Sequence, residues 1–231
     1  MRNDLTYLSL IIDRSVSMAL IAKEATNGLR DLIEKQKQVP GECRLSITVF
    51  DDKFDDLFTD ADIKGVDEKT ISIQPRGWTR LYDAVGSTVK KLGERLNALP
   101  EDQRPAAVIV AIITDGYEND SNEFTRKQVA DMVKEQKEKY NWTFTFIGAN
   151  QDSFAVAESI GISRGMAMNF SPDGAHSRKS YGALNSAVTR GRNAGISGQS
   201  VGAAMNYSTE ERTSALAAAD QHLAVDPKAD A

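Results

Sequence analysis

The sequence predicts an α/β protein in which helices cover both faces of a mostly parallel sheet. Apolar, strand-forming runs alternate along the chain with segments whose apolar residues recur at helical spacing. The run from Ala106 to Ile113 is apolar on both faces, as is typical of a strand in the middle of a parallel sheet. Right-handed crossovers between such strands give a three-layer, doubly wound, Rossmann-like arrangement.

The first half of the chain is expected to contribute three strands and two helices. The expected strands are residues 5–12, 45–50 and 54–58, the last two joined by a hairpin turn at Asp51-Asp52-Lys53. The third strand is acidic, which favours an antiparallel edge strand. The helices are predicted from the spacing of two sets of residues: Met18, Ile21, Ala25, Leu29 and Leu32, then Leu81, Val85, Thr88, Leu92 and Leu96. Pro40-Gly41 and Pro100 end them, and residues 65–77 are expected to form a loop.

The second half repeats the alternation and then changes in composition. We expect strands at 106–113, 142–147 and 166–170, and helices at 124–140 and 153–160. Between Gly174 and Thr209 there is no Asp or Glu. We therefore divide the chain into a domain of residues 1–190 and a C-terminal extension of residues 191–231. Ser208 and Glu211 predict a capping box for an Ala-rich helix that runs to about Val225.

Composition narrows the class of protein. The chain has 231 residues, of which 41% are hydrophobic and 26% charged, an ordinary mixture for a globular domain. Its net charge of −5 argues against a general nucleic-acid binder, and its single cysteine, Cys43, cannot form an internal disulfide. The N-terminal residues lack the features of a signal peptide, and no run reaches the ~20 apolar residues of a membrane span. We therefore expect a cytoplasmic protein that has no part in the membrane.

Three short motifs place oxygen-bearing side chains at the ends of strands or before helices. Asp13, Ser15 and Ser17 follow the first strand, Thr79 lies in a loop before a helix, and Asp115 ends the central apolar strand. Ligands of doubly wound sheets bind beyond the carboxyl ends of the strands, so neighbouring strands would bring these oxygens together. Two carboxylates and three hydroxyls, without thiolate or imidazole, favour Mg²⁺ over zinc. The sequence therefore predicts a surface Mg²⁺ site, with Mn²⁺ or Ca²⁺ as alternatives.

The same motifs carry a resemblance to a known family. Asp13-Arg14-Ser15-Val16-Ser17 resembles the D-x-S-x-S element of von Willebrand factor type A (VWA) domains, GWTRLYDA resembles their threonine loop, and IITDG resembles their second-aspartate strand. The order and context match over residues 5–170. This sequence is therefore similar to a stand-alone intracellular VWA member of bacterial or phage type. Two positions depart from the family pattern, because Val16 and Trp78 stand where glycine or another small residue is frequent.

The resemblance implies a function and a role for each motif residue. It implies a metal-ion-dependent adhesion site, in which Asp13, Ser15 and Ser17 hold the metal, Thr79 can join them, and Asp115 acts directly or through water. It also implies that a partner protein supplies an Asp or Glu oxygen to the metal, that the chain is not an enzyme, and that the partner is in some members an AAA+ ATPase.

The side chains around the site are candidates for contact with the partner. Trp and Arg are enriched among interface hot spots, so Arg14, Trp78, Arg80 and Tyr117 are the predicted rim. Other interpretations stay open at this point. Asp13, Ser15 or Ser17 could serve as helix caps, Trp78 could pack into the base of its loop, and Arg14 could pair with a nearby acid.

Two other functions also stay open. One is an Mg²⁺-dependent phosphoryl-transfer enzyme that uses Asp13, although the sequence has no phosphate-binding loop and no His near the motifs. The other is nucleic-acid binding through the basic segment 174–192, which the acidic net charge and the lack of a recognised RNA-binding motif oppose.

Overall fold

The structure is a computed structural model of the chain, and it describes residues 1–150 and 152–224. Six strands form one sheet in the order β3-β2-β1-β4-β5-β6. Their bounds are Arg2–Asp13 for β1, Glu42–Phe50 for β2, Phe54–Asp62 for β3, Pro105–Thr114 for β4, Thr143–Gly148 for β5 and Ala167–Asn169 for β6. All neighbouring pairs are parallel except β2 and β3. The predicted fold class, a mostly parallel sheet with one antiparallel edge strand, is confirmed.

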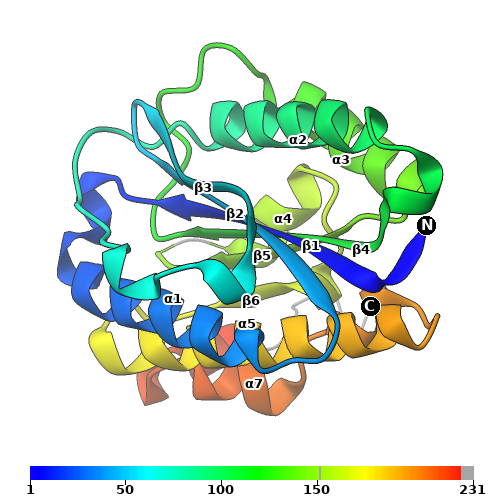
Figure 1. Cartoon of the computed structure of the whole chain (residues 1–231). Helices are drawn as coiled ribbons and strands as arrows, with labels where there is room; N and C mark the ends of the chain where they lie inside the picture. The colour runs from blue at the N-terminus through cyan, green and yellow to red at the C-terminus, as the bar shows by residue number, and fades with distance from the viewer. Residues whose placement is uncertain (151, 225–231) are drawn as a thin grey trace, which may run out of the picture.

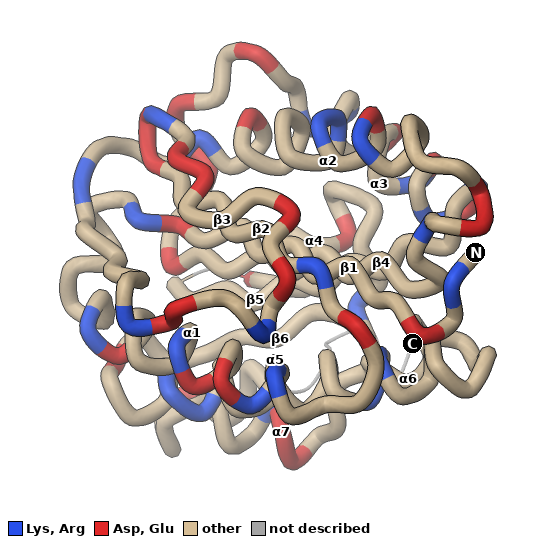
Figure 2. Tube along the Cα trace, in the orientation of Figure 1, with Lys and Arg blue, Asp and Glu red and all other residues tan. Residues whose placement is uncertain are grey.

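Helices cover both faces of this sheet and make the outer two of three layers (Figure 1). Their bounds are Ala22–Lys37 for α1, Leu81–Asn97 for α2, Arg126–Tyr140 for α3, Ser153–Ser159 for α4, Gly174–Ile196 for α5, Val201–Met205 for α6 and Thr209–Ser214 for α7. α1 and α5 lie on one face, and α2 and α3 on the other. Figure 2 shows that β4 and β5 carry no charged residue, whereas charges are spread over the outer helices and loops. Strands enclosed on both faces must be apolar on both faces, which explains the sequence of β4.

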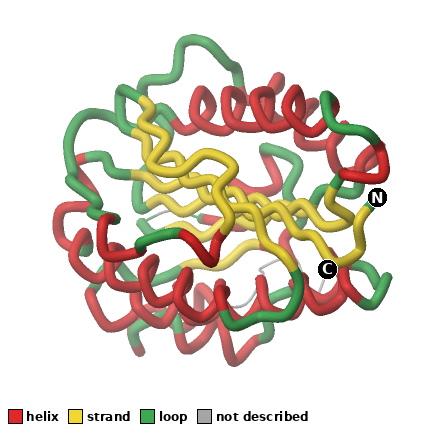
Figure 3. The backbone as a smooth tube through the Cα atoms, in the orientation of Figure 1, coloured by secondary structure: helices red, strands yellow, loops and turns green. Residues whose placement is uncertain are grey.

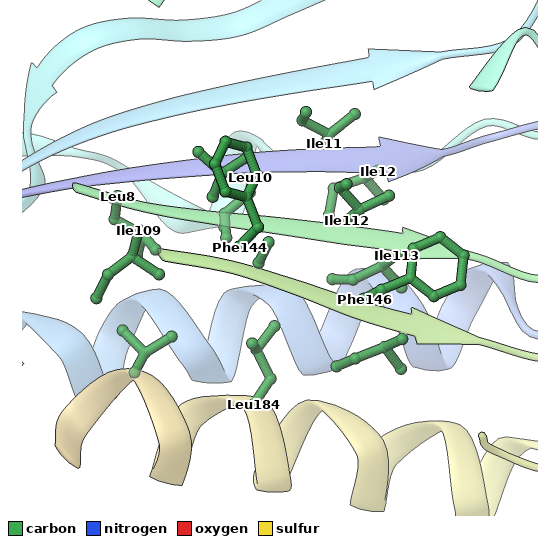
Figure 4. Close-up of a cluster of buried hydrophobic side chains, with 14 of the residues drawn as sticks. Leu8, Leu10, Ile11, Ile12, Ile109, Ile112, Ile113, Phe144, Phe146 and Leu184 are labelled. Atoms are coloured by element: carbon green, nitrogen blue, oxygen red, sulfur yellow. The ribbon is translucent and has the colours of Figure 1, made fainter. Parts of the chain in front are cut away.

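Branched and aromatic side chains fill both interfaces between the sheet and its helices. Figure 4 shows Leu8 of β1 beside Ile109 of β4, with Leu184 of α5 below the sheet. All of these side chains are fully buried. Burial of one such side chain stabilises a fold by roughly 1.5–3 kcal/mol. The packed side chains therefore hold β1 and β4 in place, and with them the carboxyl edge of the sheet.

In Figure 3 the yellow strands of the sheet lie between red helices above and below. Short 3₁₀ helices interrupt segments that the sequence pattern predicted to be uniform. The first predicted helix is divided into a 3₁₀ turn, η1 (Val16–Leu20), and α1, because the chain must first cross the edge of the sheet. The expected loop of residues 65–77 contains η3 (Glu68–Thr70), followed by two buried isoleucines, Ile71 and Ile73. The other 3₁₀ helices are η2 (Ile63–Gly65), η4 (Glu101–Gln103), η5 (Arg164–Met166) and η6 (Ala218–Ala224).

The C-terminal segment packs against the sheet, but not as one long helix. The predicted capping box of Ser208 and Glu211 is present at the start of α7. α7 ends at Ser214 because the chain then turns along β6, where the Ser171 N–H donates to the Ala215 carbonyl at 3.0 Å. The predicted helix end near Val225 lies outside the described residues. α5 crosses positions 190 and 191, and the division into a domain and an extension stays a prediction. Within the described part of the chain, every helix is too short or too polar to span a bilayer.

Candidate metal centre

The predicted site lies where two neighbouring strands end. β1 and β4 pair in parallel with Ile12 opposite Ile113, so Asp13 and Asp115 leave the same edge of the sheet. This edge is also a topological switch point. The chain adds β2 and β3 on one side of β1 and then adds β4, β5 and β6 on the other side. Open α/β sheets bind ligands at such a point.

Asp13 is held by two hydrogen bonds and has no exposed surface. Its Oδ1 accepts the Ser15 backbone N–H at 2.7 Å, and its Oδ2 accepts the Thr114 hydroxyl at 2.5 Å. Ser15 lies just before η1 but its side chain makes no capping bond, and the residue before α1 is Ile21. Ser15 is therefore not a side-chain cap of η1. The motif instead forms a tight turn around the Asp13 carboxylate.

The two serines connect this turn to the second carboxylate. The Ser15 and Ser17 hydroxyl oxygens are 2.9 Å apart, and the Ser17 hydroxyl donates to Asp115 Oδ1 at 2.5 Å. Asn150 also fixes Asp115, since its Nδ2 donates to the Asp115 carbonyl at 3.0 Å. Four oxygen-bearing side chains from two strand ends are thus joined in one chain of contacts.

Thr79 completes the cluster from a third loop. Its backbone is tied to Asn119 on both sides, with the Thr79 N–H donating to Asn119 Oδ1 at 3.0 Å and the Asn119 N–H donating to the Thr79 carbonyl at 3.1 Å. A Cβ placed on Gly116 would lie 3.1 Å from Ser17 Oγ and 3.4 Å from Thr79 Oγ1. Because residue 116 is glycine, the space beside these two hydroxyls stays open. The structure brings together all five residues that the sequence predicted as ligands.

Both carboxylates are in an environment that disfavours negative charge. Burial raises the pKa of Asp13 to about 6, and the nearby Asp115 adds to this, while the hydrogen bonds from Thr114 and Ser15 oppose it. Burial also raises the pKa of Asp115, against the hydrogen bond from Ser17. Among the described residues, no lysine or arginine forms an ion pair with either carboxylate.

A divalent cation fits this donor set. Two carboxylates and three hydroxyls are hard oxygen donors, and a nearby positive charge would relieve the cost of burying Asp13 and Asp115 as anions. No group of three or more His, Cys, Asp or Glu residues suited to a metal exists in residues 1–150 and 152–224. The candidate site therefore depends on hydroxyls as much as on carboxylates.

The four residues predicted as a rim differ in their exposure to solvent. Trp78 and Tyr117 are exposed beside the cluster, so Trp78 does not pack into the base of its loop. Arg80 is half-buried and pairs with Asp120 at 2.6 Å. Arg14 is not on the rim surface, which corrects the prediction: its side chain is buried and pairs with Asp51 at 2.8 Å and Asp55 at 2.6 Å. It points away from the site because these two carboxylates lie on the β2–β3 side of the loop.

A buried carboxylate that the sequence analysis treated as a turn residue connects the site loops. Asp51 has no exposed surface, and it binds Arg14, the Lys53 backbone N–H at 2.6 Å and Arg76 at 2.7 Å. The Arg76 N–H donates to the Arg14 carbonyl at 2.8 Å, and the Val16 N–H donates to the Gly77 carbonyl at 3.3 Å. The loop of Thr79 is thereby fixed to the loop of Ser15.

Asp83 is a second positioning residue that the sequence pattern did not indicate. It lies in the first turn of α2 and accepts the backbone N–H groups of Asn122, Glu123 and Phe124 at 2.9, 2.9 and 2.7 Å. These bonds hold the loop that follows Asp115. In the sequence, Asp83 is indistinguishable from an ordinary acid at a helix N-terminus.

Comparison with known proteins gives a similarity of fold. No family model matches the chain, and no curated protein matches its sequence. The structure is similar to proximal thread matrix protein 1 from the mussel byssus, with a TM-score of 0.56 and 14% identity over 80% of this chain. A further structure of that protein has a zinc-occupied MIDAS motif. This chain covers 46% of the mussel protein's length, so it spans less than half of it.

Two microbial proteins show the same likeness. The D319A mutant of the PilB minor pilin from Streptococcus sanguinis has a TM-score of 0.55 and 11% identity, covering 83% of this chain and 62% of that one. The ArnB paralog VWA2 from Sulfolobus acidocaldarius has a TM-score of 0.50 and 18% identity, covering 78% and 45%. The chain thus has a VWA-like fold.

Proposed function

We propose that this chain is a metal-dependent protein-binding module. A divalent cation, for which Mg²⁺ is our choice, is held by Asp13, Ser15, Ser17, Thr79 and Asp115, directly or through water. When bound, it supplies a coordination position for an Asp or Glu oxygen of a partner protein. The observation that carries the proposal is the pair of buried carboxylates clustered with the hydroxyls of Ser15, Ser17 and Thr79. In the part of the chain that the structure describes, no Lys or Arg forms an ion pair with either carboxylate.

The phosphoryl-transfer alternative has less support. A nucleophilic Asp must reach its substrate, but both oxygens of Asp13 are engaged by Ser15 and Thr114 and the side chain is fully buried. The only histidines, His176 and His222, lie in α5 and η6 and not in the site loops.

Nucleic-acid binding through residues 174–192 also has less support. Two of its basic side chains are used inside the fold. Arg192 is buried and donates to the Gln36 carbonyl at the end of α1, and Arg190 pairs with Glu211 at 2.8 Å. A phosphate-binding surface requires basic groups that face solvent.

The first test is metal binding by isothermal titration calorimetry with Mg²⁺, Mn²⁺ and Ca²⁺. We expect Asp115→Asn to weaken Mg²⁺ binding at least about tenfold, because it removes one of two ligand charges. Asp131→Asn, on the exposed face of α3, is the matched control and should bind as wild type does. Equal affinity of wild type and Asp115→Asn would contradict the site.

The second test is affinity capture in Mg²⁺ followed by elution with EDTA. Partners of a metal-dependent module are retained by wild type and Asp131→Asn, lost from Asp115→Asn and released by EDTA. An AAA+ ATPase is the partner class that the family resemblance suggests for this experiment. Binding that persists in excess EDTA would refute metal-mediated recognition. The cytoplasmic location stays a prediction.

A further inference from the structure

Large apolar side chains are unusually exposed around the candidate metal centre. Four of them form what we call the apolar rim: Val16, Leu20, Trp78 and Tyr117, which are 63%, 85%, 66% and 62% exposed. Leu20 is the most exposed large hydrophobic side chain in the described residues. Clusters of exposed apolar residues on globular proteins are typical of interaction sites, whereas isolated ones need no explanation.

The apolar rim borders the metal centre in the chain and in space. Val16 lies between the candidate ligands Ser15 and Ser17, and Leu20 ends the same 3₁₀ turn. Trp78 precedes Thr79, and its loop is bound to the first one by the hydrogen bond from the Val16 N–H to the Gly77 carbonyl. Tyr117 follows Gly116, which lies against Ser17 and Thr79. Each of the three ligand loops therefore presents an apolar side chain to solvent.

The charges in these loops are balanced within the protein. Each arginine of the three loops is in an ion pair: Arg14 and Arg76 with Asp51 and Asp55, and Arg80 with Asp120. The loop after Asp115 also carries Glu118, whose carboxylate accepts the Tyr82 N–H at 3.1 Å. Within these three loops, a second carboxylate on a partner would thus meet arginines that are already paired.

We infer that the site recognises a carboxylate flanked by large apolar side chains on a protein segment. This rests on the proposed function, since the metal takes the carboxylate. The apolar rim then contacts the flanking side chains, and Trp78 is the largest contact surface. Trp and Tyr are enriched among residues that dominate binding energy, which agrees with their place here.

The test is a selection of phage-displayed, disulfide-cyclised peptides with a fixed central Asp and random flanking positions. The Mg²⁺-loaded full chain is the target, and bound phage are eluted with EDTA. We expect Phe, Trp, Leu and Ile to be enriched next to the Asp. Enrichment of polar or acidic residues in the EDTA-eluted pool would overturn the inference while leaving the proposed function intact. Absence of any EDTA-eluted binder would overturn both.

Variants of the rim separate recognition from metal binding. For a selected peptide, Leu20→Ser with Trp78→Ser should weaken binding at least about tenfold, as expected for loss of a hot spot. Mg²⁺ affinity, measured without peptide, should stay that of wild type because neither side chain is a ligand. Tyr140→Ser, at the exposed end of α3 beyond the opposite edge of the sheet, is the matched control. Equal loss in Tyr140→Ser would overturn the inference.

A second copy of this chain is the competing occupant of the rim. Sedimentation velocity of the Mg²⁺-loaded chain over a range of concentrations should show a monomer. A dimer that disappears in the Leu20→Ser, Trp78→Ser variant would show that the apolar rims of two copies pack against each other. This result would overturn the inference.

Discussion

Two aspartates at the ends of adjacent strands have opposite electrostatic surroundings. Asp13 ends β1, and Asp51 directly follows β2, where Phe50 lies opposite Asp13. Both side chains have no exposed surface. Burial raises the pKa of Asp13 to about 6. Burial acts in the same direction on Asp51, but the hydrogen bonds from Arg76, the Lys53 N–H and Arg14 outweigh it and lower the pKa of Asp51.

The same residue type thus has a structural role at one position and a binding role at the other. Asp51 is neutralised by arginines of this chain, so it contributes to holding the loops in place. Asp13 receives only neutral hydrogen-bond donors, so its charge is left for an external cation. A buried carboxylate without a cation is destabilising for the isolated protein, and such groups are found at functional sites.

The largest expected effect is on stability, and it separates the two aspartates. Asp51→Asn should lower the free energy of unfolding by about 3 kcal/mol, because Arg14 stays buried with one of its two carboxylate partners removed. Asp13→Asn should not lower it in EDTA at pH 7.5, because it removes an uncompensated charge and keeps the side chain's shape. Urea denaturation measures both, with Asp131→Asn as control. Equal losses for the two variants would contradict the comparison.

The pH dependence of metal-free stability should sharpen the contrast. The folded pKa of Asp13, about 6, lies above its ordinary value of 3.8, so the folded state binds the proton more tightly than the unfolded state. The resulting stability is present at low pH and is lost as the pH rises through about 6, by about 2 kcal/mol between pH 4.5 and 7.

Measuring wild type and Asp13→Asn in EDTA isolates this contribution, since the other carboxylates titrate in both proteins. The difference between their unfolding free energies should shift in favour of Asp13→Asn as the pH rises. A difference that is constant between pH 4.5 and 7 would show that Asp13 is balanced by a charge within the protein, as Asp51 is.

The smallest expected effect is on Mg²⁺ affinity, and it comes from filling the space beside the Ser17 and Thr79 hydroxyls. Gly116→Ala places a Cβ 3.1 Å from Ser17 Oγ and 3.4 Å from Thr79 Oγ1, so the Ser17 hydroxyl must shift by a few tenths of an ångström. We expect Mg²⁺ affinity to fall about tenfold with little change in stability, since overpacking at a loop edge is relieved by small shifts. Calorimetric titration measures the affinity, and Gly182→Ala, where a Cβ meets open space, is the control. Unchanged affinity in Gly116→Ala would place the metal away from this gap.

Several features were predictable because they depend on local pattern. The apolar runs and helical spacings predicted the six strands and the helices α1 to α4, but not α5, the longest described helix. The three motifs predicted which side chains the sheet brings together. The 3₁₀ turn η1 was not predictable from spacing, because Met18 and Ile21 satisfy a helical pattern equally well.

Strand periodicity predicted the fold class and the meeting of Asp13 and Asp115, since parallel strands end together. The motifs before the following helices predicted Ser15, Ser17 and Thr79. Only the tertiary structure decided the roles of the charged side chains nearby. Arg14 is adjacent to Asp13 in the chain, yet its side chain reaches Asp51 and Asp55 because β2 and β3 lie on that side. Ion pairing depends on distances across the fold, and short sequence patterns do not contain them.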